Sequence, residues 1–534
     1  MTVAMPEETM GRVYSGKAES KGIQFSVHTE KMADAAARVP QVRLPRPTRY
    51  RYPIDPEVFA KLKAGAPTSE ISGRDETTLF ADTAVAASGM LMAAGGVPPG
   101  APPPVTSQPN VSPQFSGIDA TGWLPYDCAM AAGPQNIVCS VNSSVAAFDK
   151  SGNQLFQTTL SAWFAPVLQG ANIFDPRLMF DANAQKFILA TTAYNDQNQS
   201  WFLLSVSQTA DATGAWWYYI LDASLDGSTP TNNWADYPGL GQDDDSVYLT
   251  ANMFQWGQNG TFQYAKLRIV PKALLYSGGV LTFQDIVGMQ NDDGSMVFGM
   301  HPCNSMEACS NELLVNTIYP NDATSTQAKV SLWTVQAGPT LQRVTVACNA
   351  YGIPPHADQK GGAPPLDTGD ARILNAIFRN GSVWSSFCTQ HNWDEATNVA
   401  AIFWMEIDPN GTLQQQGIFG APSLHYFYPA VVTDTAGNLT VVFSRSGASE
   451  YASLYCAGRK SADAPGSLGG SVLLKAGVAH YIGLDSATPK RNRWGDYSAV
   501  SQEPDAADAD SVWLYGGYVS ATNKWSTWVA KAKM

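Results

Sequence analysis

Short runs of alternating apolar and polar residues cover the chain from about residue 115 onward. Runs such as SVAAFD and AIFWMEID are rich in β-branched and aromatic residues, and turn sequences such as DKSGN, DPNG, DTAGN and RNG stand beside such runs. A period of two is typical of half-buried strands, and Gly and Asn accept the positive φ of tight hairpins. Long amphipathic helices would need more Glu, Lys and Leu. The pattern predicts an all-β protein.

Six of these segments share an opening, in which an Asp or Tyr is followed by a short mixed run, a turn and an alternating strand. Their first residues are Asp127, Asp175, Asp236, Asp370, Tyr428 and Asp496. A seventh segment, after His301, fits less well because its turn is hard to place. Six intervals then separate Asp127 from Asp496, a mean period of about 61 residues, which suits one four-stranded blade per repeat. We predict a single β-propeller of about seven blades, or six, with a sandwich pair or a parallel β-helix as alternatives.

Residues 1–113 differ from this pattern and are predicted to form an irregular, Pro-rich N-terminal extension before a propeller over residues 114–534. Pro and Arg alternate in RVPQVRLPRPTRYRYPIDP, which cannot form a central strand because Pro lacks a backbone donor. A short helix is expected from Pro56 to Lys63, followed by the linker GGVPPGAPPPVTSQPNVSP. This arm could be disordered, wrap the propeller or dock to a larger assembly.

The charge and hydropathy of the chain exclude some classes of binding partner. The formal net charge is −13 and charged residues make up 15%, which argues against binding to a phosphate backbone. No stretch approaches the roughly 18–20 apolar residues of a membrane helix. The expected partner is therefore a protein or a glycan, with no nucleic acid and no membrane span. A propeller of this kind is expected to be secreted or held at the cell surface, although the N-terminus has no standard signal peptide.

The candidate site is the mouth of the propeller channel, where each inner strand begins. Its expected ligand-binding residues are Asp127, Asp175, Arg177, Asp236, Asp370, Arg372 and Asp496. A carboxylate ring could hold a cation or a polar ligand, but each Asp could instead cap backbone N–H groups or bond the neighbouring blade. Each Arg stands two residues after a ring Asp, so we expect it to pair with that carboxylate. Recognition of an anionic substrate is the alternative.

Two acidic loops and two cysteine pairs complete the candidate residues. Asp243, Asp244 and Asp245, and the run EPDAADAD from Glu503 to Asp510, could hold Ca²⁺ or be solvated turns. No other cofactor is expected. Cys303 and Cys309 bracket a short polar loop, and Cys128 and Cys139 flank a predicted hairpin. Each pair could form a disulfide, with buried reduced thiols as the alternative.

Three segments carry a resemblance to known proteins: WADYPGLGQDDDSVYLT from Trp234, LDTGDARILNAIFRNGSVW from Leu366 and NRWGDYSAV from Asn492. They resemble uncharacterised bacterial propeller proteins, loosely related to sialidase-type propellers, over roughly residues 120–534. The resemblance implies a propeller that is usually exported. The sialidase Asp-box is only echoed by TDTAGNLT from Thr433, the F/Y-R-I-P motif is absent, and an arginine triad with a Tyr–Glu pair cannot be mapped. The resemblance thus supports the fold rather than hydrolysis.

Two functional hypotheses follow. The first is a non-catalytic binding or assembly module, because the mouth residues recur in most repeats and no catalytic constellation is localised. The second is a glycan-active hydrolase or lyase, sialidase-like if a hydrolase, that uses ring carboxylates at the mouth. One or two carboxyls with perturbed environments in a deep pocket would favour catalysis, whereas ring carboxyls tied to the backbone would favour a scaffold.

Overall fold

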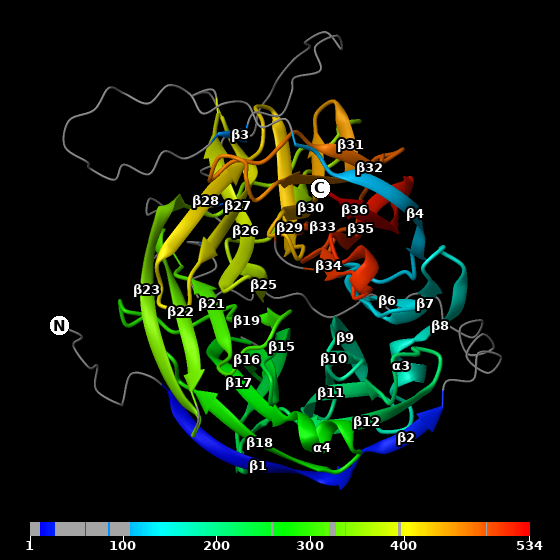
Figure 1. Cartoon of the computed structure of the whole chain (residues 1–534), viewed down its shortest axis with the longest axis vertical. Helices are drawn as coiled ribbons and strands as arrows, with labels where there is room; N and C mark the ends of the chain where they lie inside the picture. Colours follow the sequence, from blue (N-terminus) through cyan, green and yellow to red (C-terminus); the bar gives the residue numbers. More distant parts are fainter. Residues whose placement is uncertain are drawn as a thin grey trace.

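The computed structural model of the chain describes residues 11–26, 59, 63, 84–85, 107–257, 260–319, 327–336, 338–393, 397–486 and 489–534. The strands form seven antiparallel four-stranded units, numbered here blades 1 to 7 in chain order. Figure 1 shows them around a common centre.

The strand bounds follow blade by blade. Blades 1 to 3 are β5–β8 (Ala129–Ala132, Asn136–Val141, Ser144–Asp149, Gln154–Thr159), β9–β12 (Asn172–Asp181, Lys186–Tyr194, Ser200–Ser207, Ala215–Asp222) and β15–β18 (Asn233–Gln242, Ser246–Gln255, Phe262–Pro271, Val280–Val287). Blades 4 and 5 are β19 with β21–β23 (His301–Pro302, Leu313–Thr317, Gln327–Gln336, Thr340–Tyr351) and β25–β28 (Ile373–Arg379, Ser382–Asn392, Asn398–Ile407, Leu413–Phe419). Blades 6 and 7 are β29–β32 (Leu424–Thr433, Leu439–Gly447, Glu450–Arg459, Val472–Lys475) and β34–β36 with β4 (Ala499–Gln502, Ser511–Ala521, Lys524–Lys533, Asn110–Asp119).

Only short elements lie between the blades. They are the strands β13 (Leu225–Asp226), β14 (Thr229–Pro230), β20 (Asn304–Ser305), β24 (Leu366–Asp367) and β33 (Asn492–Arg493), the helices α3 (Leu160–Trp163) and α4 (Lys272–Tyr276), and a 3₁₀ turn at Ala506–Asp508. β20 pairs in parallel with both β15 and β25, and so fuses blades 3 and 5 into one eleven-stranded sheet. The other five blades are separate sheets.

The inner strands contact one another in a closed ring, in the order β5, β9, β15, β19, β25, β29, β34 and back to β5. A sandwich or a β-helix has no such ring. The prediction of an all-β propeller is therefore confirmed, although the fusion of blades 3 and 5 makes the division into blades less regular than the sequence repeat.

Apolar side chains between neighbouring blades form the core. Between blades 1 and 2, for example, Val138 and Val145 pack in one buried cluster with Phe187 and Trp216. Trp163 of α3 lies edge-on to Trp216, with 5.0 Å between ring centroids. Burial of such large aromatic faces stabilises the contact between blades.

The N-terminal arm supplies outer strands to the propeller. β1 (Arg12–Lys21) pairs with β18, β2 (Ile23–Ser26) with β12, β3 (Ala84–Val85) with β28, and β4 with β36. Figure 1 shows β1 and β2, in blue, along the outer edge of blades 3 and 2. In its described residues the arm therefore wraps the propeller, and β4 completes the blade that closes the ring. The division at residue 113 stays a prediction, and β4 crosses it.

The predicted helix at 56–63 is described at two positions only. Phe59 and Lys63 are both helical and are 2% and 7% exposed. The rest of that segment, and the Pro-rich linker before residue 107, lie outside the described residues. Among the residues that the structure describes, no helix is long and apolar enough to cross a membrane.

Candidate functional site

Three inner strands share an irregularity close to where they begin. In β9, β15 and β29, a residue followed by Pro adopts a left-handed conformation, with φ of 53° at Asp175, 52° at Tyr237 and 53° at Tyr428. The ladder of each strand skips a partner at this point, which marks a β-bulge. Pro lacks a backbone donor and fits inside a strand only at an edge or a bulge. We call this end of the channel the start mouth.

Ring carboxylates of the start mouth connect neighbouring blades. Asp127 Oδ1 accepts a hydrogen bond from the backbone N–H of Asp496 at 2.7 Å, and Asp175 Oδ2 accepts one from the N–H of Tyr237 at 3.2 Å. Asn142 donates to Asp127 and accepts from the Asp175 N–H, the latter at 2.7 Å. Four blades are therefore joined through residues near the starts of their inner strands and through Asn142 in the turn between β6 and β7.

The two predicted arginines have different partners. Arg372 makes a bidentate ion pair with Asp370, with Nη2 2.5 Å from Oδ2 and Nε 2.8 Å from Oδ1. Burial opposes ionisation of Asp370, but the Arg372 guanidinium holds the pKa of that carboxyl below its usual value. Among the described residues, Arg177 has no ion pair, and its Nε donates to the carbonyl of Pro238 at 2.8 Å. The expected pairing holds for Arg372 and is wrong for Arg177.

The other three ring carboxylates differ in their bonding partners and burial. Asp496 receives two bonds from Arg493 Nη2, at 2.5 and 2.6 Å. Asp236 is buried in β15 directly before the bulge. Asp127 is fully buried, and this burial, with the nearby carboxylates of Asp496 and Asp175, raises the pKa of Asp127 well above its usual value. The ring thus contains one carboxyl group that favours its protonated form.

A second ion cluster at the start mouth centres on Asp367, which is 2% exposed. Its carboxylate lies 3.4 Å from His356 Nδ1, 3.6 Å from Lys63 Nζ and 3.6 Å from Arg491 Nη1. Burial opposes ionisation, but His356, Lys63 and Arg491 hold the pKa of Asp367 well below its usual value. Lys63 belongs to the N-terminal arm and also donates to Thr368 at 3.0 Å. The arm is therefore fixed to the mouth by a buried ion pair.

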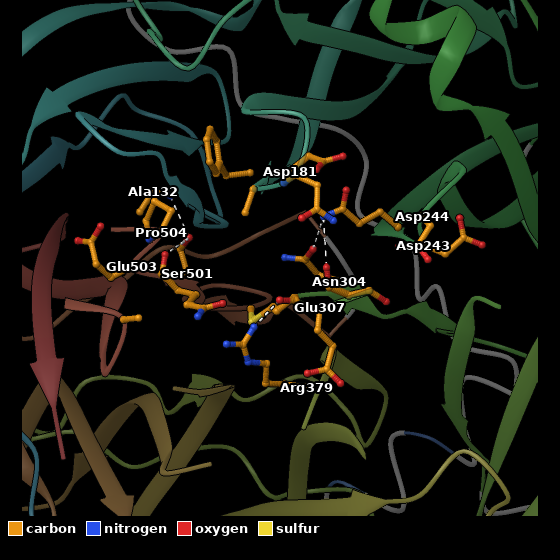
Figure 2. A pocket seen from close by; sticks show the side chains of 18 of the residues that line it. Ala132, Asp181, Asp243, Asp244, Asn304, Glu307, Arg379, Ser501, Glu503 and Pro504 are labelled. Atoms are coloured by element: carbon orange, nitrogen blue, oxygen red, sulfur yellow. Dashed lines mark hydrogen bonds between the residues drawn. The ribbon is translucent and has the colours of Figure 1, made fainter. Parts of the chain in front are cut away.

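The opposite end of the channel holds a cavity of about 250 Å³, which we call the end cavity. Figure 2 shows polar side chains that converge on it from several blades, among them Asp181 at the end of β9, Asn304 of β20, Arg379 at the end of β25 and Ser501 of β34. The sequence pointed to part of this site, because Asp243, Asp244 and Glu503 of the two acidic loops line it. It did not indicate that these loops meet strand-end residues of other blades, because those residues share no motif.

The carboxylates that line the end cavity are already engaged. Asp181 contacts Lys272 Nζ at 2.7 Å, Glu503 contacts Lys150 Nζ at 2.9 Å, and Glu307 accepts from two backbone N–H groups at 2.8 and 2.9 Å. Asp244 accepts from the N–H of Cys309 at 3.1 Å. These bonds tie the carboxylates to the surrounding framework.

A neutral amide oxygen in the wall of the end cavity lacks a partner in the described structure. Gln242 is 4% exposed, and its Nε2 donates to Asn304 Oδ1 at 3.2 Å, while its Oε1 has no hydrogen-bond partner in the described structure. Ser305 is 8% exposed, and its hydroxyl group interacts with the thiol of Cys309. The parallel pair of β15 with β20 brings Gln242 and Ser305 together. Both residues line the cavity, so its wall contains an amide oxygen without a partner beside a serine hydroxyl group.

The acidic loops form turns. Asp243 accepts from the backbone N–H of Asp245 and Ser246 and from the hydroxyl of Tyr248, the last at 2.6 Å. In the second loop, Asp508 and Asp510 pair with Lys531 and Lys533. No three His, Cys, Asp or Glu side chains are grouped to hold a metal ion in the part of the chain that the structure describes. Both loops fit the alternative of hydrogen-bonded turns, and Ca²⁺ stays a prediction.

All seven cysteines are free thiols, so the two expected disulfides do not form in this structure. The β5–β6 register places Cys139 opposite Met130, which leaves Cys128 diagonal to it rather than directly across. In the other pair, Cys303 is buried, whereas the partly exposed Cys309 donates to the carbonyl of Asn311 at 3.0 Å. The alternative of reduced thiols describes both pairs.

Comparison with known proteins finds only solved structures of low sequence identity. No protein-family model matches it, and no curated protein is similar to it. Similar solved structures include a Trypanosoma rangeli sialidase with 2,3-difluorosialic acid (10% identity, 73% of this chain and 56% of that chain, TM-score 0.34) and a Fusarium graminearum GH93 α-L-arabinofuranosidase with arabinobiose (9%, 78% and 97%, 0.35). A Hadza microbial sialidase gives 12% identity, 75% of this chain and 74% of that chain, and a TM-score of 0.38. At these sequence identities and TM-scores, no activity is assigned to the chain.

Proposed function

We propose that the protein is a non-catalytic β-propeller that binds a glycan and holds one sugar unit in the end cavity. The observation that supports this proposal is Gln242 Oε1, an amide oxygen without a hydrogen-bond partner in the described structure, in a side chain more than nine-tenths buried in the cavity wall beside Ser305. A sugar hydroxyl both donates and accepts, so it suits an amide oxygen and a hydroxyl group together. The volume of about 250 Å³ is just below the roughly 300–1,000 Å³ of sites for drug-sized ligands.

The start mouth supports the non-catalytic part of the proposal. Four of its five predicted carboxylates bond a backbone N–H of the next blade or an arginine, which is the arrangement expected of a scaffold. Secretion or a cell-surface location, and docking of the arm to a larger assembly, stay predictions from the sequence.

A glycan array followed by titration calorimetry tests the proposal. We expect the double variant Gln242→Leu/Ser305→Ala to weaken binding of the array's best glycan at least tenfold. The control is Gln208→Leu. Nε2 of Gln208 has no hydrogen-bond partner in the described structure, and this residue lies outside the cavity. The control variant should bind the glycan with the same affinity as the wild type. Unchanged binding in the double variant, or no glycan binding by the wild type, contradicts the proposal.

A glycoside hydrolase with its site at the start mouth is the second candidate. It is favoured by Asp127, because a carboxyl group with a raised pKa beside other carboxylates is what a general acid requires. Turnover of chromogenic glycosides that Asp127→Asn abolishes, and that Gln242→Leu leaves unchanged, would replace the binding proposal with this one.

A further inference from the structure

Arg177 is a buried cation with no ion-pair partner among the described residues. It is 8% exposed, and its guanidinium lies over the ring of Tyr497, with Cζ 3.6 Å from the centroid. Nε donates to Pro238 O at 2.8 Å and Nη1 to Leu374 O at 3.4 Å. Nη2 is buried and has no hydrogen-bond partner in the described structure. A charge taken out of water is costly unless an opposite charge compensates it.

This guanidinium lines a small cavity on the propeller axis, which we call the central cavity. It has a volume of about 70 Å³, and residues from all seven inner strands line it. Such a volume holds a monatomic ion or one small polyatomic group together with water. Asn304 and Met306 line both this cavity and the end cavity, so the two spaces are neighbours.

His301 faces the same space in its neutral form. Its Nδ1 lies 2.9 Å from the carbonyl of Pro302 and so carries the proton, which leaves Nε2 as an acceptor. Nε2 is buried and has no partner in the described part of the chain. Burial, and then the charge of Arg177, lower the pKa of His301 to about 3. A ligand of Arg177 therefore meets one fixed positive charge and one neutral ring.

We propose that the central cavity binds a small monovalent anion, either a halide or a single carboxylate group, beside the guanidinium of Arg177. Charge-assisted N–H bonds to anions are roughly twice as strong as neutral ones, and a guanidinium directs its donors in a fixed plane. A water molecule beside the anion donates to Nε2 of His301. This site is separate from the proposed glycan site and does not depend on it.

The test uses the full chain in sodium gluconate, whose anion is too large for the cavity. Chloride, bromide and formate are added at constant ionic strength while the melting temperature is followed. A saturable rise of the melting temperature with chloride or bromide supports a halide site, and such a rise with formate supports a carboxylate site. Crystals grown in bromide should show anomalous density beside Arg177 Nη2. No saturable rise with any of the anions, together with no bromide in the cavity, means that it holds only water and overturns the proposal.

Variants make the assignment specific. Arg177→Met should abolish the saturable rise of the melting temperature with anion concentration. Arg177→Lys should raise the anion concentration that gives half of this rise at least tenfold, because the planar donor group is lost. The control is Arg459→Met. Arg459 is 2% exposed, donates to a backbone carbonyl, has no ion pair among the described residues and does not line the cavity. The Arg459→Met variant should have a lower melting temperature than the wild type but the same rise of that temperature on addition of the anion. An equal response in Arg177→Met and the wild type contradicts the site.

Discussion

Blades 2 and 5 contain the same Asp-x-Arg spacing with opposite results. In blade 5, Asp370 and Arg372 stand before β25 begins, and Asp370 Oδ1 also accepts from the backbone N–H of Arg372 at 2.9 Å. This local turn folds the guanidinium back onto the carboxylate. In blade 2, Asp175 and Arg177 lie inside β9, where the ladder pairs Phe174 with Thr192 and Arg177 with Ala190.

The bulge explains the difference. In a regular strand, residues two apart face the same side, so the spacing alone predicts an ion pair in both blades. Two residues oppose one at a bulge, which breaks the alternation. Asp175 then meets the backbone of blade 3, while Arg177 is directed onto Tyr497 and into the central cavity. The same spacing therefore gives an ion pair in the turn before β25 and none across the bulge of β9.

The largest effect is expected from Asp370→Asn. Asp370 is 2% exposed, and its replacement leaves the largely buried Arg372 guanidinium facing a neutral amide; removal of one partner of such a pair costs about 3–5 kcal/mol of unfolding free energy. Denaturant unfolding measures this loss. The double variant Asp370→Asn/Arg372→Met should recover most of this loss, because the guanidinium is removed together with the carboxylate. A double variant as unstable as the single one would show that the ion pair is not the cause.

Asp175 provides the matched test in blade 2. Asp175→Ala should cost about 1–3 kcal/mol, because the buried N–H of Tyr237 loses its acceptor. Asp175→Asn keeps an oxygen for this bond and should cost under about 1 kcal/mol. The amide substitution is thus mild in blade 2 and severe in blade 5. Equal losses for the two Asp→Asn variants would mean that Asp175 does pair with Arg177.

The fold was more predictable than the site, for a physical reason. A blade is a local meander, so its alternation and turns recur along the sequence, and the Asp at each strand start marks the same end of the channel. The outer strands of the arm carry no such signal. In RVYSGKAESK of β1 every residue except Ala18 is partly or fully exposed, so backbone pairing with β18 is the main interaction that positions the strand.

The end cavity could not be predicted for a different reason. Gln242 and Ser305 are 63 residues apart, and they meet through a two-residue parallel contact between blades. The Asp-Pro dipeptide at Asp175 and the Tyr-Pro dipeptides at Tyr237 and Tyr428 do carry a sequence signal for the bulges, because a Pro inside an inner strand is accommodated at a bulge. With that signal, the separation of Asp175 from Arg177 could have been foreseen.

Glu312 is the acidic counterpart of Arg177. Glu312 is fully buried, and neither carboxyl oxygen has a hydrogen-bond partner in the described structure. Burial, and then the charge of Asp243, raise the pKa of Glu312 well above its usual value. Unlike an arginine, a carboxyl group can lose its charge by taking up a proton, and this direction of the pKa shift favours that form.

A raised pKa in the folded state means that the folded chain binds the proton more tightly than the unfolded chain. The resulting stability is complete below the unfolded pKa, near 4.3, and is lost as the pH rises through the folded pKa. Glu312→Gln, which is neutral at every pH, should therefore match the wild type near pH 4 and exceed it by about 1–2 kcal/mol at pH 8. Thermal unfolding of both proteins between pH 4 and pH 8 measures the difference. A gap that stays constant across this range would show that Glu312 does not titrate in the folded protein.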